Sequence, residues 1–485
     1  MLSLVVEVLI WRYALANELE GHSMHVYDNV LDMIGQTPML RLNGYDTGPC
    51  ELYLKLENTN PGGSIKDRIG LTMIKKAEAR GDIKPGDTLI EATAGNTGLG
   101  LALAAGQLGY HLMLVVPDKM SPEKIFNLKA MGVEVVLTRS DVLKGHPQYY
   151  QDLAASISKE RGAYYINQFA NPDNAEAHVQ TTGPEIWQQL DGAVDAVVVG
   201  VGSSGTVSGL SKYFQSTGRD VELVLADPKG SILAEYIASG KLTEGGSWLV
   251  EGIGEDFIPE ICDFSSTKSA YTIDDAESFA TARELLAKTG VLGGSSTGTL
   301  LAAALRYCKD QTEPKKVVAF VCDTGNKYLS KQYNDFWMED QGFITREPHG
   351  DLRDLIGRPH DELATVTVGV TDHLATAHNR LRNAGFSQLP VIDDGVLVGI
   401  LTEDDIMRYA FQRPESFSDS VEGVMRRTFL RVACDTSVNN LVSMLEVRPY
   451  AAVMEDEKFL GLITRADVLN YLRRQHQSTP ARASS

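Results

Sequence analysis

The 485-residue chain carries a formal net charge of −19, and 43% of its residues are hydrophobic. An acidic chain without dense lysine and arginine clusters lacks the surface that phosphate backbones require, so nucleic acid is excluded as a partner. The length exceeds what one hydrophobic core normally supports, which predicts roughly two to four domains. Small-molecule chemistry is the function class that this composition favours.

The five cysteines are scattered, and no two of them form a C-x-x-C pair. This pattern predicts reduced thiols in a cytoplasmic protein, with no disulfide framework and no metal site. No apolar run reaches the roughly 18 residues of a membrane span. Leu2–Trp11 is short, contains Glu7 and follows no basic segment. Residues 1–24 are therefore interpreted as an N-terminal extension, with Met24 as an alternative start.

Residues 25–340 alternate β-rich runs with helical patterns. The predicted strands are Glu51–Leu56, Thr88–Glu91, His111–Val116, Val133–Thr138, Ala196–Val199, Glu222–Ala226 and Val317–Val321. The predicted helices include Thr97–Leu108, Pro122–Met131, Gln148–Arg161, Ala175–Gln189 with a kink at Gly183-Pro184, and Ala276–Lys288. Several strands are apolar on both faces, which predicts an α/β domain with a parallel sheet and ligands at the strand carboxyl ends.

Lys66 follows a Gly62-Gly63 turn and opens a helix. The helix is predicted from a spacing of four between apolar residues, up to Arg80-Gly81, at Ile65, Ile69, Met73 and Ala77. In the first turn, the helix dipole and burial both disfavour the ammonium form, which suits a nucleophile or a base. The alternative is a solvent-facing lysine paired with Asp67.

The stretch Glu91-Ala92-Thr93-Ala94-Gly95-Asn96-Thr97-Gly98 runs from a strand end through small residues into a helix. Backbone N–H groups and hydroxyls at a helix start form an anion pocket, which suits a substrate carboxylate. The alternative is a plain turn in which Asn96 or Thr97 caps the helix.

Gly200-Val201-Gly202-Ser203-Ser204-Gly205-Thr206 lies between a strand and a helix and matches G-x-G-x-x-G. Asp227 ends the following strand, where a dinucleotide-binding fold would place its ribose-binding acid. A dehydrogenase therefore remains an alternative at this point. Both interpretations place a phosphate on the glycine-rich loop.

Val291-Leu292-Gly293-Gly294-Ser295-Ser296-Thr297-Gly298 again leads from glycine and serine into a helix. A serine hydroxyl there could hydrogen-bond a ring nitrogen without forcing that nitrogen to be protonated. The alternative is that Ser295 or Ser296 only caps the helix predicted at Thr299–Tyr307.

Together, these four stretches resemble the cysteine synthase and cystathionine β-synthase family of fold-type II (tryptophan synthase β-like) pyridoxal phosphate enzymes, over residues 25–340. The resemblance implies Lys66 as the catalytic lysine that binds the cofactor and Asn96 beside its phenolic oxygen. It further implies Ser295 at the ring nitrogen and a phosphate cradle made of Gly202, Ser203, Ser204, Gly205 and Thr206. The implied substrate-binding residues are Thr93, Ala94, Gly95, Thr97 and Gln168.

Segments 227–233 and 251–259 resemble the cystathionine β-synthase branch of the family. That branch implies condensation of L-serine with L-homocysteine to L-cystathionine in transsulfuration, and release of hydrogen sulfide from cysteine as a further activity. It also implies a homodimer or a higher homo-oligomer. Three residues depart from the sequence pattern of that branch: Val179 after His178, Ala94, and Glu255, which stands in place of a tyrosine. These departures leave the identity of the thiol substrate open. The alternatives are an O-acetylserine sulfhydrylase and, more weakly, a non-catalytic adenosyl-ligand sensor. No cysteine–histidine pair of the haem-binding kind is found near the N-terminus, which predicts no haem.

A linker is predicted at residues 341–352, and residues 353–474 repeat themselves with an offset of 62 residues. The repeats resemble a tandem CBS-domain module, which implies an adenosyl ligand held by Thr402, Asp405, Thr464 and Asp467. A helix-capping box explains the same T-x-x-D pattern without a ligand. The module could also serve assembly, and residues 475–485 are predicted to be a disordered tail.

Overall fold

The computed structural model describes residues 26–478 except Ala94, Lys119, Ser121, Leu143 and Pro414. The expected N-terminal extension, the predicted substrate residue Ala94 and residues 479–485 of the expected tail therefore lie outside the described residues. The chain divides into two compact units between Leu329 and Ser330, before the expected linker. We call them the N-terminal unit and the C-terminal unit.

The larger sheet of the N-terminal unit has the strand order β1-β2-β10-β7-β8-β9. Only β1 runs antiparallel to its neighbour. In sheet order, these strands span Met39–Arg41, Glu51–Lys55, Lys316–Phe320, Ala196–Val199, Glu222–Pro228 and Thr267–Ile273. The strands β7, β8 and β10 are buried along almost their whole length, because helices cover both faces of the sheet.

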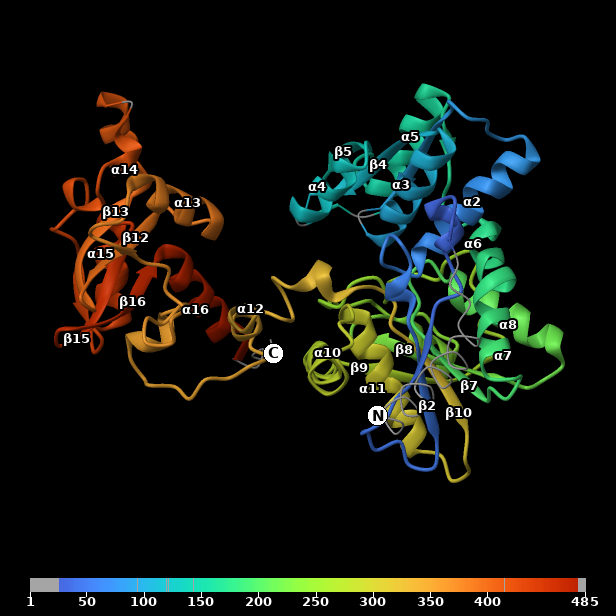
Figure 1. Cartoon of the computed structure of the whole chain (residues 1–485). Helices are drawn as coiled ribbons and strands as arrows, with labels where there is room; N and C mark the ends of the chain where they lie inside the picture. The colour runs from blue at the N-terminus through green and yellow to red at the C-terminus, as the bar shows by residue number, and fades with distance from the viewer. Residues whose placement is uncertain are drawn as a thin grey trace, which may run out of the picture. The chain divides into compact units, whose positions relative to one another are not determined.

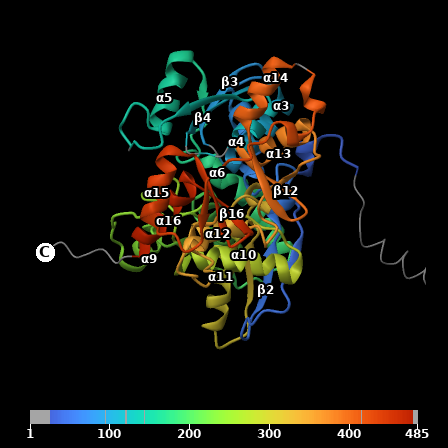
Figure 2. The same ribbon diagram turned by 90° about the vertical axis from the view of Figure 1, so that its left-hand side faces the viewer.

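A second, smaller sheet has the order β5-β4-β3-β6 and is parallel throughout. Its strands span, in that order, Glu134–Thr138, His111–Pro117, Thr88–Ala92 and Tyr164–Tyr165. In Figure 1, β4 lies among α3, α4 and α5, apart from β2 and the helices α10 and α11, and Figure 2 shows β3 in the same part of the unit. The predicted parallel α/β fold is confirmed, and its strands are shared between two sheets.

The helices of the N-terminal unit connect these strands. They are α2 Lys66–Arg80, α3 Asn96–Leu108, α4 Pro122–Ala130, α5 Tyr150–Arg161, α6 Pro172–Ala177, α7 Gly183–Gln189, α8 Gly205–Thr217, α9 Leu233–Ser239, α10 Asp275–Thr289 and α11 Ser295–Lys309. Short 3₁₀ turns occur at Val30–Met33, Glu57–Thr59 and Gly325–Tyr328. The kink predicted at Gly183-Pro184 is a π-helical turn, His178–Thr182, that ends just before these residues.

The C-terminal unit contains two three-stranded sheets of the same design, β11-β12-β13 and β14-β15-β16. In each sheet a short first strand pairs in parallel with a hairpin, and both hairpins shift register at equivalent positions, Val391/Ile392 and Val453/Met454. The strands span Val368–Gly369, Gln388–Asp393, Val396–Thr402, Arg431–Ala433, Tyr450–Glu455 and Lys458–Thr464. The predicted internal repeat is therefore confirmed.

The helices of this unit are α12 Asp335–Asp340, α13 Leu374–Ala384, α14 Glu403–Gln412, α15 Val438–Val447 and α16 Arg465–Ser478, with 3₁₀ turns at Leu352–Leu355, Ser416–Ser418 and Val421–Gly423. The last helix continues past Gln475, the expected start of the tail, to Ser478. No helix among the described residues is long and apolar enough to cross a membrane.

Candidate functional site

Lys66 is the first residue of α2, as predicted, directly after the glycine turn. Asp67 does not pair with it: the Asp67 Oδ2 atom accepts a hydrogen bond from the Gly62 N–H at 2.6 Å. The alternative of a solvent-facing Lys66–Asp67 pair is therefore wrong. Burial lowers the pKa of the Lys66 amine, while Cys322 and Glu255 nearby raise it. In this environment the amine is a stronger nucleophile and base at neutral pH.

Helices α2 and α3 pack with their backbones in contact at Gly70 and Gly100. A Cβ atom on Gly100 would lie 2.6 Å from the Lys66 carbonyl oxygen, and one on Gly70 would lie 2.5 Å from the Gly100 carbonyl carbon. Any larger side chain at either position would push the helices apart. The two glycines thus hold Lys66 against the first turns of α3, beside the predicted substrate loop.

Within the predicted substrate site, Thr97 and Gln168 are joined directly, since the Thr97 hydroxyl donates to Gln168 Oε1 at 2.8 Å. The Thr93 hydroxyl accepts from the Gly95 N–H at 3.2 Å. The structure therefore brings together all the predicted substrate residues that it describes.

Glu91, which sequence reasoning did not assign a role, holds this substrate site in place. It lies at the end of β3, fully buried, and its carboxylate accepts hydrogen bonds from the N–H groups of Ala92 at 2.8 Å and Gln168 at 3.0 Å. Burial raises the pKa of Glu91 to about 8. An acidic residue ending an apolar strand was the one signal that could have identified it.

The glycine-rich loop packs closely against neighbouring segments at Gly202 and Gly205, where no side chain would fit. A Cβ atom on Gly202 would lie 2.7 Å from the Gly252 carbonyl oxygen, and one on Gly205 would lie 1.9 Å from Asn174 Oδ1. The loop ends at the first turn of α8, and no side chain caps that helix. Uncapped N–H groups at a helix start suit a phosphate, so these residues fit the predicted cradle.

Asn174 was not predicted, yet it connects this cradle to the substrate residues. Its Nδ2 group donates to the Gln168 carbonyl oxygen at 2.8 Å and to the Ser203 hydroxyl at 2.9 Å. Asp227, the ribose-binding acid of the dinucleotide alternative, instead accepts from the Ala234 N–H at 2.8 Å in the first turn of α9. This use of Asp227 gives the dinucleotide alternative no support.

Ser295 is the first residue of α11, and the helix cap is Gly294. The alternative in which Ser295 or Ser296 caps this helix is therefore wrong. The Ser295 hydroxyl accepts a hydrogen bond from the Glu251 N–H at 2.9 Å, and the side chain is buried. A serine used in this way keeps its own proton available for a ring nitrogen.

Asn96 is the first residue of α3, not its cap. Its Nδ2 group donates to Asp323 Oδ2 at 2.8 Å, and its Oδ1 atom accepts from the Lys327 amine at 2.6 Å. Tyr328 donates to the same oxygen of Asp323 at 2.7 Å. The predicted contact between Asn96 and the ring oxygen stays a prediction, but the amide orientation is fixed by its two partners.

Comparisons with known proteins identify the family. A family model described as "Pyridoxal-phosphate dependent enzyme" matches residues 30–323, and the CBS domain model matches residues 354–411 and 421–474. The chain belongs to the pyridoxal-phosphate dependent enzymes. The family match excludes the dinucleotide alternative for the glycine-rich loop and implies pyridoxal phosphate as the cofactor of the N-terminal unit.

Named relatives match both units or the N-terminal unit alone. The chain is 33% identical to the cystathionine beta-synthase of Apis mellifera, over 94% of this chain and 93% of that protein. It is 38% identical to a cysteine synthase of Staphylococcus aureus, over 64% of this chain and 97% of that protein. The crystal structure of a hydrogen sulfide-producing enzyme from Fusobacterium nucleatum aligns with a TM-score of 0.58 and 36% identity, over 63% of this chain and 100% of that one.

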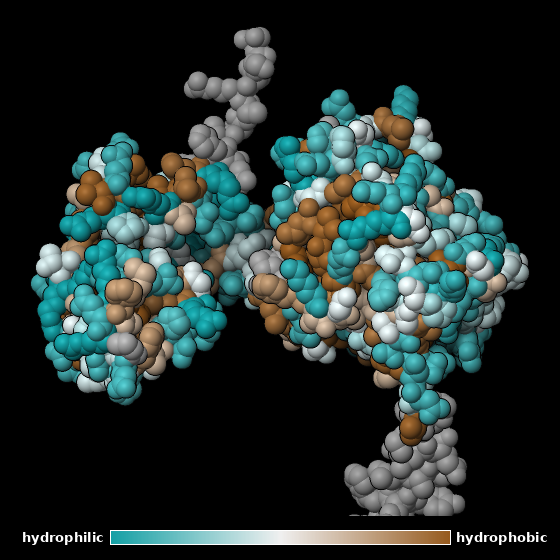
Figure 3. All heavy atoms as spheres, turned by 90° about the horizontal axis from the view of Figure 1, so that it is seen from above, coloured by the Kyte–Doolittle hydropathy of each residue, from teal (hydrophilic) through white to brown (hydrophobic). Residues whose placement is uncertain are grey.

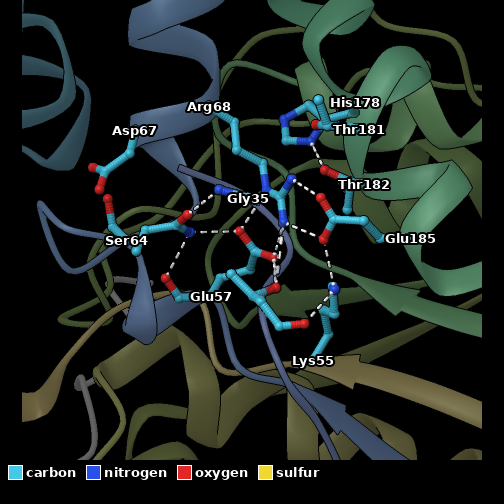
Figure 4. Close-up of polar contacts among 12 residues, drawn as sticks. Gly35, Lys55, Glu57, Ser64, Asp67, Arg68, His178, Thr181, Thr182 and Glu185 are labelled. Carbon is cyan, nitrogen blue, oxygen red and sulfur yellow. Dashed lines mark hydrogen bonds and ion pairs between the residues drawn. The ribbon is translucent and has the colours of Figure 1, made fainter. Parts of the chain in front are cut away.

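In this family member, a buried ion network secures the start of α2 (Figure 4). Arg68 binds Glu57 through Nε at 2.7 Å and Glu185 through Nη1 at 2.6 Å, and Lys55 binds Glu185 at 2.7 Å. Although burial raises the pKa of Glu185, Arg68 and Lys55 lower it to about 2. The network fixes α2 two residues beyond Lys66 and ties it to α7.

His178 connects the π-helical turn to the predicted phosphate cradle. Its Nδ1 atom lies 2.9 Å from the Thr182 hydroxyl, and its Nε2 atom lies 3.3 Å from the Thr206 hydroxyl. Burial lowers the pKa of His178 well below its usual value, so the ring is neutral. Sequence reasoning noted His178 only as the neighbour of Val179 and missed this contact.

In the CBS module, Thr402 and Asp405 form the full capping box of the alternative: the Asp405 N–H donates to the Thr402 hydroxyl at 3.2 Å, and the Thr402 N–H donates to Asp405 Oδ2 at 3.1 Å. In the second repeat, the Thr464 N–H donates to Asp467 Oδ2 at 2.7 Å, which is one of the two bonds of such a box. Asp405 also binds Arg426 at 2.7 Å. Adenosyl binding at these residues stays a prediction. Within the described ranges, no group of three His, Cys, Asp or Glu residues could hold a metal ion.

Proposed function

We propose that this family member is a cystathionine β-synthase that replaces the β-hydroxyl group of L-serine with the sulfur of L-homocysteine. The observation that carries the proposal is the buried amine of Lys66, which is held by α2 and α3 beside an anion cradle and a substrate loop. Similarity to cystathionine beta-synthases along both units supports the choice of subfamily. The match to the cysteine synthase of Staphylococcus aureus, by contrast, covers only 64% of this chain.

The residues present fit pyridoxal phosphate. In our proposal, Lys66 binds the cofactor aldehyde, Gly202–Thr206 binds its phosphate, and Ser295 and Asn96 contact the ring nitrogen and the ring oxygen. When bound, the cofactor withdraws electrons from the α-carbon of the amino acid. Because burial lowers the pKa of Lys66, the released amine can take the α-proton and later return it.

The loop before α3 would bind the substrate carboxylate. The carboxylate would contact its backbone N–H groups and the hydroxyl of Thr93, while Gln168 is fixed by its bond to Thr97. Glu91 anchors both sides of this loop through backbone N–H groups. An anion bound at the start of α3 is further stabilised by the helix dipole.

The test is a product assay by mass spectrometry on the purified cofactor-loaded enzyme. Serine plus homocysteine is compared with O-acetylserine plus sulfide under matched conditions. We expect cystathionine to form faster than cysteine. Faster cysteine formation would reject the proposal in favour of the O-acetylserine sulfhydrylase alternative. No turnover of either pair, together with adenosyl binding, would favour the non-catalytic sensor.

Several finer properties belong to the same proposal. We expect the enzyme to release hydrogen sulfide from cysteine, to need no haem and to act in the cytoplasm. The CBS module would bind an adenosyl ligand at Thr464 and Asp467 or at Thr402 and Asp405.

We also expect a homodimer or a higher homo-oligomer. Apolar surface is visible on both units in Figure 3. Large apolar side chains on the C-terminal unit are strongly exposed, including Phe411 at 91% and Val447 at 81%. Such exposed apolar residues favour contact with a second copy of the chain.

A further inference from the structure

Glu255, which departs from the tyrosine of related synthases, is fixed at the edge of the site by its backbone. Its N–H group donates to the Ser231 hydroxyl at 3.1 Å, and that hydroxyl lies 3.1 Å from the Glu255 carbonyl oxygen. The same carbonyl accepts from the Ile232 N–H at 3.1 Å. The segment therefore presents its side chain in a defined direction.

The carboxyl group of Glu255 lies near both the proposed phosphate cradle and Lys66. Its Oε1 atom would be 3.9 Å from a Cβ atom on Gly202. It is also close enough to Lys66 for each charge to change the pKa of the other group. Among the described residues, no side-chain hydrogen bond is made by this carboxyl group, although most other acids of the site are bonded. It is thus available to a ligand.

The groups around Glu255 favour its protonated form. Burial raises the pKa of Glu255 well above its usual value, the charges of Asp256 and Asp227 raise it further, and Lys66 opposes them. Tyr149, which precedes α5, and Tyr150, its first residue, also lie near it, since the Glu255 charge contributes to the raised pKa of both phenols. A carboxylic acid kept neutral in this way can donate a proton at neutral pH.

The proposed reaction needs such a donor. The hydroxyl of serine leaves readily only as water, and Lys66 is occupied with the α-proton. We propose that Glu255 is the catalytic acid that contacts the β-substituent of the substrate, protonates the departing serine hydroxyl, and then accepts the proton of the incoming thiol. This inference rests on the proposed function and assigns a residue to its unassigned step.

The proton and electron balance closes within the reaction. Lys66 takes the α-proton, the Cβ–O bond breaks with its electron pair on oxygen, and the Glu255 proton completes a water molecule. The Glu255 carboxylate then takes the thiol proton as the new S–Cβ bond forms, and Lys66 returns the α-proton. Serine and thiol thus give thioether and water, and no oxidant or reductant is needed.

The decisive experiment compares Glu255→Gln with wild type on two substrates at pH 7, where the proposed acid is protonated. With serine and homocysteine we expect a loss of about 100-fold or more, the usual size of a general-acid contribution. With O-acetylserine, whose acetate leaves without a proton, we expect a loss below about 10-fold. Equal losses on both substrates would overturn the proposal, as would full activity with serine.

Three controls separate this role from folding and from the cofactor. Glu260→Gln changes an exposed acid in the same segment and should leave both rates unchanged. Glu255→Asp keeps the acid and should recover serine turnover relative to Glu255→Gln. Exchange of the alanine α-proton in D₂O, followed by NMR, should stay within about 3-fold of wild type in every variant, because Lys66 performs that step.

A second readout needs no turnover. In cofactor-free protein, the pH dependence of the reaction of Lys66 with pyridoxal reports the pKa of its amine. Once Glu255 ionises at alkaline pH, its charge raises the pKa of Lys66, so Glu255→Gln should shift the alkaline midpoint to lower pH. An unchanged midpoint would mean that the two groups are too far apart to share a substrate. If the wild-type enzyme makes cysteine in place of cystathionine, the proposed function fails. The role of Glu255 is then decided by comparing the rate losses of Glu255→Gln on serine and on O-acetylserine, with sulfide as the second substrate.

Discussion

Substituting Glu57 with glutamine tests whether the buried ion network holds the catalytic helix. The Glu57 carboxylate is 0% exposed and accepts four side-chain hydrogen bonds, from Arg68 Nε at 2.7 Å, Arg68 Nη2 at 2.8 Å, Thr37 at 2.7 Å and Asn60 at 2.9 Å. Glutamine keeps the volume but loses the charge, and its amide places one donor where two oxygens now accept.

The expected loss of stability in Glu57→Gln depends on the hydrogen bonds that Arg68 retains. Removing one partner of a buried pair costs about 3–5 kcal/mol, mostly because the other charge is left buried without compensation. Arg68 retains two hydrogen bonds to Glu185, at 2.6 and 2.7 Å, so we expect the lower end, about 3 kcal/mol. For a unit of about 300 residues, whose unfolding entropy is about 2.1 cal/mol/K per residue, that corresponds to a fall of about 4–5 °C in the melting temperature.

The assay is thermal unfolding of the cofactor-loaded full chain, followed by the absorbance of the cofactor, which reports on the N-terminal unit alone. The matched control is Glu134→Gln, which removes an acid from an arginine pair at 3.1 Å whose side chains are 51% and 56% exposed. Such exposed pairs contribute about 1 kcal/mol or less. Equal shifts for Glu57→Gln and Glu134→Gln would refute the reasoning.

Four further predictions concern the site, its pH dependence and the CBS module. Lys66→Ala should remove the visible absorbance of covalently bound cofactor and abolish β-replacement; a yellow, active variant contradicts the assignment of the lysine. Gly205→Ala should weaken cofactor binding about 5- to 150-fold in a fluorescence titration, since its Cβ would overlap Asn174 at 1.9 Å and overpacking costs about 1–3 kcal/mol. Glu185 has a pKa lowered to about 2, so its contribution to stability is present above the ordinary glutamate pKa near 4.5 and is lost as pH falls toward 2; denaturant titrations should show this loss in wild type and a smaller one in Glu185→Gln. Asp467→Ala should abolish calorimetric binding of S-adenosylmethionine, and an unchanged titration would reject the ribose-binding role.

The residues that the sequence predicted correctly are those whose signal is local. A glycine turn before an apolar helix pattern is enough to place Lys66 at the start of α2, and a strand–glycine–helix pattern places Gly202 and Gly205. The buried strands were predicted with small boundary errors because they are apolar on both faces. β9 was missed because it is a partly exposed edge strand with polar residues.

What the sequence could not reveal depends on distant partners. Arg68 meets Glu185 across 117 positions, and Lys55 meets the same carboxylate across 130, so no short pattern marks the network. Asn174 likewise becomes important only when folding places its amide between Gln168 and Ser203. A side chain that only positions another residue produces no recognisable sequence pattern, because packing between distant elements decides which residue it contacts.

The local signals share one physical basis, which would bring them together in the proposed site. The stretches predicted for the cofactor and substrate are four helix starts, at Lys66, Asn96, Gly205 and Ser295. Each helix N-terminus carries about half a positive charge, so four bring about two positive charges together. The phosphate of the cofactor carries about 1.5–2 negative charges and offsets them. Burial disfavours an ammonium group at Lys66, and the positive end of a helix acts in the same direction, so the arrangement that would attract the phosphate would also favour the neutral amine.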